Sequence, residues 1–191
     1  MPKPILYNSL LTVLFVLFVC KVQAQNVTNY TSNNKVLVTL HGINRAYNFT
    51  SDELLVRYNN NTQKLECVLN IATLLPINDT IPPNMAYDVF FAAKYPDLVL
   101  FIDAPVEKVS GSNLYPGSIN KTTTISLQGA TKQMVIPLAL TADRNAIVFN
   151  TSFDLMLDNF SASVPVQYFN LLTGRIMITL NNARWVGMEI R

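Results

Sequence analysis

The side chains best suited to catalysis are few and scattered along this chain. His41 is the only histidine, and Cys67 is the only cysteine outside the apolar N-terminal segment. A zinc site made of several imidazoles is therefore excluded, and any zinc ion would need unusual help from carboxylates. A His41–Cys67 dyad is conceivable, but both residues lie in apolar stretches typical of strands, and no third group that would orient the histidine is evident.

Other catalytic arrangements find no better support. A Ser-His-Asp triad would need the same histidine, and the chain has no Gly-X-Ser-X-Gly elbow. The six glycines are dispersed and form no phosphate-binding loop. The nearest carboxylate groupings, Asp52 with Glu53 and Asp154 with Asp158, lie at expected strand edges and turns that face water. The sequence thus predicts a protein that is not an enzyme, with no catalytic residue, metal or cofactor.

The first 24 residues have the three parts of a secretory signal peptide. Lys3 is the basic residue near the N-terminus, and the apolar run spans 10–20. The compact residues Val22 and Ala24 precede an expected cleavage site. The apolar run is too short for a spanning helix, which needs roughly 20 such residues. Lipidation at Cys20 is an alternative, although Val19 stands where a lipobox has a small residue. We expect a periplasmic or secreted protein, with no stable membrane span after cleavage.

The mature part has no charge excess that would attract a polyanion. Removal of residues 1–24 takes away Lys3 and Lys21, so the 14 basic residues fall to 12 against 12 acidic ones. The remaining basic residues are dispersed rather than clustered, which argues against nucleic acid as a partner. The mature length suits one domain with a real core, and a homodimer remains compatible with the sequence.

Alternating apolar and polar residues predict an all-β domain. We expect a flexible lead-in over residues 25–34 and an ordered domain over 35–191. A proline-broken segment at 74–83 precedes one expected short helix at 84–95, suited to capping a barrel end. The other segments predict about eight strands that close into an antiparallel barrel. These strands are expected at 35–43, 52–58, 63–71, 98–103, 118–127, 133–140, 146–157 and 174–184.

Four stretches of the chain, taken in order, resemble the YceI-like family. Residues 92–101 are similar to the family's helix end, Lys-Tyr-Pro turn and next strand. Residues 118–132 resemble a strand, a Gly-Val-Thr-Lys turn with Ala130 in place of valine, and the start of the next strand. Residues 153–165 and 174–180 are similar to the late strand, with its aromatic turn before a proline, and to the closing strand. The N-terminal third departs from the pattern, and 40–43 is only a loose counterpart of the family's histidine-containing stretch.

This resemblance implies an exported, lipocalin-like barrel that sequesters or carries an apolar ligand. The ligand classes implied are a polyisoprenoid, an isoprenoid quinone and a fatty-acid-like lipid, held inside the barrel. The alternative is an interaction or stress-response protein with a filled barrel that acts through its outer surface. Each lining candidate could equally be core, because lining and core share one face of a strand. The residues expected to line the interior are Leu65, Leu69, Phe90, Phe101, Met134, Ile136, Phe149, Phe153 and Ile178.

Overall fold

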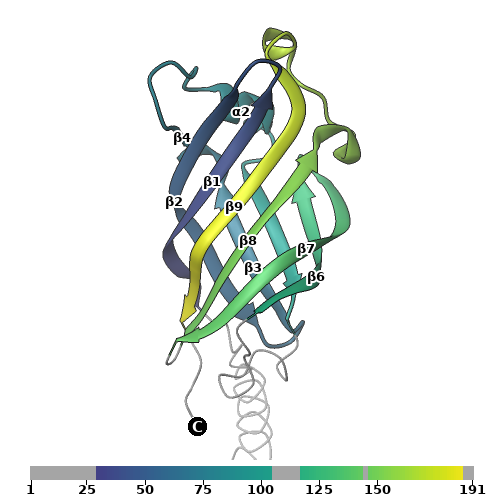
Figure 1. Cartoon of the computed structure of the whole chain (residues 1–191). Helices are drawn as coiled ribbons and strands as arrows, with labels where there is room; N and C mark the ends of the chain where they lie inside the picture. Colours follow the sequence, from purple (N-terminus) through teal and green to yellow (C-terminus); the bar gives the residue numbers. More distant parts are fainter. Residues whose placement is uncertain (1–28, 105–116, 144–145, 187–191) are drawn as a thin grey trace, which may run out of the picture.

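A computed structural model describes residues 29–104, 117–143 and 146–186 as an antiparallel β-barrel (Figure 1). The predicted signal peptide and the turn expected at 109–117 lie outside these residues, apart from Gly117. The strands are β1 (Thr31–Gly42), β2 (Ala46–Asn59), β3 (Lys64–Asn70), β4 (Leu75–Pro76), β5 (Asp97–Asp103), β6 (Gly117–Leu127), β7 (Ala130–Asp143), β8 (Ala146–Met156) and β9 (Leu172–Val186). The short helices are η1 (Ile71–Thr73), α2 (Met85–Val89), η3 (Leu157–Phe160) and η4 (Val166–Tyr168).

Eight of the strands close into a barrel. The hydrogen-bonded order is β1-β9-β8-β7-β6-β5-β3-β2, and an additional β1–β2 pairing joins the two ends of that series. All pairings are antiparallel. The two-residue β4 pairs only with Phe49 and Thr50 of β2. Each of the eight long strands therefore has a hydrogen-bonded neighbour on both sides over at least part of its length. The predicted all-β, eight-stranded barrel with one short α-helix is confirmed.

The sequence forms these strands because apolar residues alternate with polar ones. In β8, Phe149, Phe153 and Leu155 are buried, whereas Ser152 and Asp154 between them are exposed. Successive side chains of a strand point to opposite faces, so the apolar set lies inside the barrel. The inward residues of the strands form one continuous hydrophobic cluster.

Local turn chemistry fixes the hairpins. After β2, the Asn59 side-chain oxygen Oδ1 accepts hydrogen bonds from the backbone N–H groups of Asn61 and Thr62, at 3.0 and 3.1 Å. Between β6 and β7, Gln128 and Gly129 both have positive φ, 51° and 77°. That pair of left-handed residues is the arrangement of a two-residue hairpin turn whose twist suits antiparallel strands.

Three elements differ most from the sequence prediction. β2 begins at Ala46, six residues before the expected start at 52. β1 begins at Thr31, inside the expected lead-in, because the Asn34 side chain is buried and bonds both the Thr31 carbonyl and the Arg184 backbone N–H. The expected helix over 84–95 contains only five α-helical residues, Met85–Val89, and continues as turns. Its apolar residues follow a helical spacing, but Phe91 leaves the helical conformation.

Candidate functional site: the capped end of the barrel

The structure places most of the predicted lining residues in the barrel core. Five of them are at most 1% exposed: Leu65, Leu69, Ile136, Phe149 and Ile178. Phe153 is 6% exposed, and Phe90, fully buried, caps the C-terminal end of α2. Met134 is partly buried against the same core. These eight residues therefore contact one shared apolar cluster.

Phe101 is the exception, and its predicted place inside the barrel is wrong. Leu100 and Ile102 are the buried residues of β5, whereas Phe101 is half-buried between them and pairs across the sheet with Glu66 and Thr124. The run from Leu98 to Ile102 is apolar throughout, so hydrophobicity alone does not show which residues face inward. The carboxylates at the two ends of β5 could have decided it, since they share the odd-numbered face with Phe101.

The barrel interior is filled. Its largest wholly buried side chains include Phe49, Phe90 and Phe149, and many inward residues have no exposed surface at all. A water-sized void beside these side chains would give them accessible surface, so the inward faces are packed against one another. A ligand that used this interior would have to displace core side chains.

The upper end of the barrel in Figure 1 is covered by α2. Met85, Ala86 and Val89 of α2 are at most 1% exposed and belong to the core cluster. Hydrogen bonds attach α2 to neighbouring segments. At its C-terminal end, the Gln128 side-chain amide donates to the Val89 backbone carbonyl at 2.8 Å. Five residues make an unstable helix on their own, so these tertiary contacts hold α2 in place.

Asp88 attaches α2 to η4. Its carboxylate oxygen Oδ2 accepts hydrogen bonds from the Gln167 side-chain amide and the Tyr168 hydroxyl, both at 2.9 Å. Burial of the Tyr168 hydroxyl, together with its bond to Asp88, raises the pKa of this phenol. Two segments about 80 residues apart in the sequence are therefore joined at this end of the barrel.

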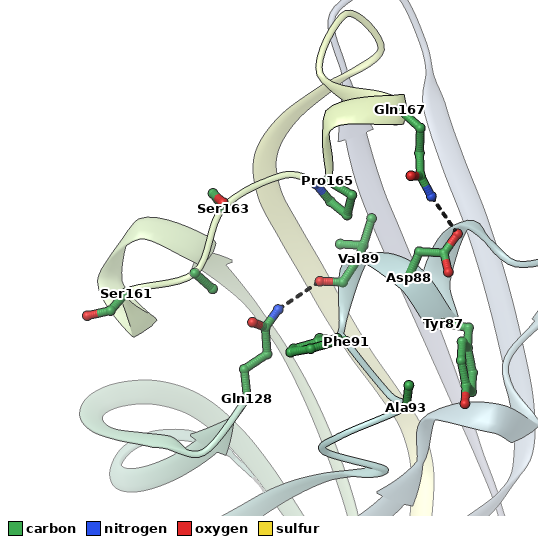
Figure 2. Close-up of a pocket in the computed structure, with 11 residues that line it drawn as sticks. Tyr87, Asp88, Val89, Phe91, Ala93, Gln128, Ser161, Ser163, Pro165 and Gln167 are labelled. Carbon is green, nitrogen blue, oxygen red and sulfur yellow. Dashed lines mark hydrogen bonds between the residues drawn. The ribbon is translucent and has the colours of Figure 1, made fainter.

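A surface pocket of about 460 Å³ lies between α2, the β6–β7 turn and the segment from η3 to η4 (Figure 2). In Figure 2, Gln128 reaches α2 from one side, while Pro165 and Gln167 approach it from the other. This pocket, here called the cap pocket, has a volume typical of small-ligand sites. Its lining residues are Tyr87, Asp88, Val89, Phe91, Ala93, Gln128, Ser161, Ala162, Ser163, Pro165 and Gln167.

The sequence prediction missed the cap pocket. Its walls come from three segments that only the closed barrel brings together, so no local pattern contains them. Because the helix was predicted to run to 95, the unusual position of Phe91 just after its end is visible only in the structure, which gives Phe91 a positive φ of 51°.

The lower end of the barrel carries the inward polar groups. The Tyr58 hydroxyl donates to the Ala104 carbonyl at 2.8 Å, and the Tyr58 ring lies 5.4 Å from the Trp185 ring. Lys121 and Thr123 are buried on β6. Within the described ranges, the Trp185 indole Nε1 has no hydrogen-bond partner, and neither does the His41 imidazole Nε2 at the opposite end.

The described residues include neither a metal-binding cluster nor a helix suited to a membrane. Across the described part of the chain, no three His, Cys, Asp or Glu side chains gather closely enough to hold a metal ion. Within the same residues, no helix combines the length and the apolar character needed to cross a bilayer.

Comparison with known proteins finds similarity in structure only. No family model matches the sequence, and no curated protein matches it. A polyisoprenoid-binding domain from Saccharophagus degradans, implicated in plant cell wall breakdown, superposes with a TM-score of 0.65 at 10% identity, covering 79% of this chain and 93% of that domain.

Two further solved structures have the same architecture. BcnA of Burkholderia cenocepacia gives a TM-score of 0.54 at 13% identity, covering 75% of this chain and 92% of BcnA. The YceI protein of Campylobacter jejuni gives 0.51 at 16% identity, covering 88% of this chain and 89% of that protein. The resemblance that the sequence suggested is thus confirmed at the level of the fold: this chain has the same barrel fold as these proteins.

Proposed function

We propose that this protein binds an elongated apolar ligand, a polyisoprenoid, an isoprenoid quinone or a fatty-acid-like lipid, within its barrel. The observation that carries the proposal is the continuous apolar interior of a closed barrel, covered at one end by a helix of only five residues. The structural similarity to a polyisoprenoid-binding domain supports it. The role proposed is binding and transport rather than catalysis.

Because the interior is filled, the ligand has to take the place of side chains that now pack there. The end covered by α2 offers a route in, since α2 is short and its polar side-chain attachments are those of Asp88 and Gln128. Once inside, each buried CH₂ of a ligand contributes about 0.8 kcal/mol. Movement of Met85 and Phe90 out of the core would open the barrel from this end.

Native mass spectrometry with organic extraction tests the proposal. The protein is purified from its own host without detergent and then titrated with quinones, prenols and fatty acids. A stoichiometric bound lipid is expected, and amide exchange of α2 should change when it binds. A clean apoprotein that also fails to bind all three lipid classes would overturn the proposal.

A second candidate function is an interaction protein with a permanently filled barrel. The packed interior favours it, as do two strongly exposed apolar side chains near η4, Val166 at 93% and Phe169 at 71% exposure. This candidate predicts no bound lipid and a protein partner that Val166→Ser and Phe169→Ser would release. If the protein carried a bound lipid and still held that partner, this second candidate function would be contradicted.

We also propose that residues 1–24 direct export and are removed, leaving the barrel in the periplasm or outside the cell. The support is the basic start, the apolar run and the small residues before the expected cleavage site. Cell fractionation combined with the intact mass of the purified protein tests this. A cytoplasmic protein that retains residues 1–24 would contradict it, and a mass increased by lipid at Cys20 would support the lipoprotein alternative.

A further inference from the structure

Phe91 has a backbone conformation that its side chain disfavours. The backbone N–H of Ala92 bonds the Tyr87 carbonyl at 2.9 Å, and that of Phe91 bonds the Asp88 carbonyl at 3.1 Å. These two bonds form a Schellman motif, in which the left-handed position is usually glycine. Here that position is Phe91, with φ of 51°. A Cβ is strained in this region, and a bulky residue especially so.

Core packing does not explain why phenylalanine is kept there. The Phe91 side chain is 48% exposed, and its aromatic contact is the edge of Tyr95, with ring centroids 6.0 Å apart. Of the six non-glycine residues with positive φ in the described ranges, Phe91, Gln128 and Ser161 line the cap pocket. The positive φ values of Gln128 and Ser161 belong to the β6–β7 hairpin turn and to the end of η3, so Phe91, a bulky residue, is the one whose strain needs another reason.

The cap pocket adjoins the barrel core. Val89 lines the pocket and belongs to the core cluster, and Ala162 of the pocket wall packs against the same cluster. An apolar chain entering beside α2 would leave its polar end at this position. The pocket is therefore placed to hold the head group of such a ligand.

The polar groups of the cap pocket favour a particular kind of head group. Its lining includes one charged residue, Asp88, and no lysine, arginine or histidine. Asp88 uses Oδ2 for its bonds to Gln167 and Tyr168, which leaves Oδ1 able to accept another donor. Gln128 uses its amide nitrogen for Val89, which leaves its carbonyl oxygen to accept. A carboxylate and an amide oxygen suit a hydroxyl donor, and the hydroxyls of Tyr87, Ser161 and Ser163 in the lining can accept from it or donate to it. The carboxylate repels a phosphate.

We infer that the cap pocket binds the uncharged, hydroxyl-bearing head group of the apolar ligand, with Phe91 as its apolar wall and Asp88 as the group that excludes anions. The inference rests on the proposed function and specifies its ligand class: isoprenoid alcohols rather than isoprenoid phosphates. In this inference, the strain of Phe91 is offset by contact of its ring with the bound ligand.

Three probes with the same isoprenoid chain test the head group: farnesol, farnesyl methyl ether and farnesyl phosphate. Each is titrated calorimetrically into protein purified from its own host and stripped of lipid. Farnesol should bind most tightly, the ether about tenfold more weakly because it lacks the donor, and the phosphate more weakly again. Equal binding of all three, or preference for the phosphate, would overturn the head-group inference while leaving the proposed function intact. If none binds and no lipid co-purifies, the proposed function itself fails.

Two substitutions separate a binding role from a structural one. Phe91→Gly removes the ring and relieves the strained φ, so farnesol should bind about tenfold more weakly while the thermal midpoint stays equal or rises. Phe169→Gly removes an exposed ring outside the pocket at ordinary φ and should not weaken farnesol binding. A lowered thermal midpoint with unchanged affinity in Phe91→Gly would show that Phe91 has only a structural role.

Asp88→Asn tests the exclusion of anions. Without the carboxylate charge, the preference for farnesol over farnesyl phosphate should shrink about tenfold. Asp158→Asn, which removes an exposed carboxylate of η3 outside the pocket lining, should leave that preference unchanged. An Asp88→Asn protein that folds and keeps the wild-type preference would contradict the role given to Asp88.

Discussion

At the scale of single residues, the outer wall of the barrel contains a buried charge. Glu66 lies on the outward face of β3, yet its side chain is only 6% exposed. Its carboxylate accepts hydrogen bonds from Arg57 Nε at 2.5 Å and Asn59 Nδ2 at 2.7 Å, and the Arg57 guanidinium lies 4.6 Å from the Tyr30 ring centroid. Tyr30 and Arg57 shield the Glu66 carboxylate from solvent. The hydrogen bonds from Arg57 and Asn59 therefore take the place of the hydrogen bonds that water would otherwise donate.

Glu66→Gln should destabilise the fold by about 1–3 kcal/mol, because Arg57 would be left partly buried without its carboxylate. Urea unfolding measures the loss. Asp52→Asn is the matched control: its pair with Lys35 spans 3.7 Å between two exposed side chains, so its removal should cost less than about 1 kcal/mol. Equal effects of the two substitutions would show that burial does not strengthen the Glu66 pair.

Cys67 makes stability depend on pH under alkaline conditions. Burial in the core, with the Glu66 charge nearby, raises the pKa of the Cys67 thiol to about 12 from an ordinary value of 9.0. Between these values the unfolded chain loses its thiol proton while the folded protein keeps it, so the free energy of unfolding falls as pH rises, by up to about 1.4 kcal/mol per unit.

Cys67→Val should therefore flatten the decline of stability above pH 9, as measured by urea unfolding at a series of pH values. Three tyrosines add to the same decline in both proteins, because burial raises the pKa of Tyr30, Tyr58 and Tyr168 as well. The comparison thus concerns the difference between the two slopes. Identical slopes would contradict the raised thiol pKa.

At the scale of secondary-structure elements, β5 shows how the face of a strand decides the role of a residue. Leu100 is 2% exposed inside the barrel, whereas Phe101, the larger side chain, is half-buried on the outer wall. Leu100→Ala should cost about 2–5 kcal/mol, and Phe101→Ala distinctly less. Thermal and urea unfolding of both variants measure this order. A greater loss from Phe101→Ala would mean that β5 is turned the other way.

The β6–β7 turn is the tightest connection near the cap pocket. Gly129 has φ of +77°, and a Cβ there would lie 2.6 Å from Cε1 of the Tyr95 ring. Gly129→Ala should therefore cost more than the roughly 1 kcal/mol expected of a left-handed alanine alone. Gly174→Ala is the control, because Gly174 has a similar φ of +80° but its added Cβ would meet only Val164 at 3.7 Å. Calorimetric melting compares the two, and equal losses would show that Tyr95 moves aside without cost.

At the scale of the whole molecule, closure of the barrel makes its first strand an internal one. β1 pairs with β2 along one side and with β9 along the other, so Val36 to Leu40 have partners on both sides. Amides of an edge strand exchange with solvent through local opening, whereas those of an internal strand need a larger opening.

Hydrogen exchange should therefore show amides of β1 between Val36 and Leu40 protected nearly as well as those of β8. The amide of Leu75, in the two-residue β4 on the barrel rim, and that of Ile77, just after β4, should exchange much faster. Mass spectrometry of peptic fragments measures both. Fast exchange across β1 would mean that the barrel opens between β1 and a neighbour in solution.

The strands could be predicted from the residues alone, because alternation of apolar and polar residues is a local pattern that follows directly from strand geometry. The sequence also placed eight of the nine predicted interior residues in contact with the core, and for residues such as Leu65 and Phe153 the polar neighbours mark the opposite face. It was wrong for Phe101, where five consecutive apolar residues conceal the alternation.

Only the tertiary structure decided where a ligand site can lie. The cap pocket joins α2, the β6–β7 turn and the η3–η4 segment, which are far apart in the sequence and meet because the barrel closes. The filled interior was equally beyond the sequence, since apolar residues that line a cavity and those that fill it have the same pattern. Whether they leave space depends on how side chains from opposite walls meet, a property of packing in three dimensions.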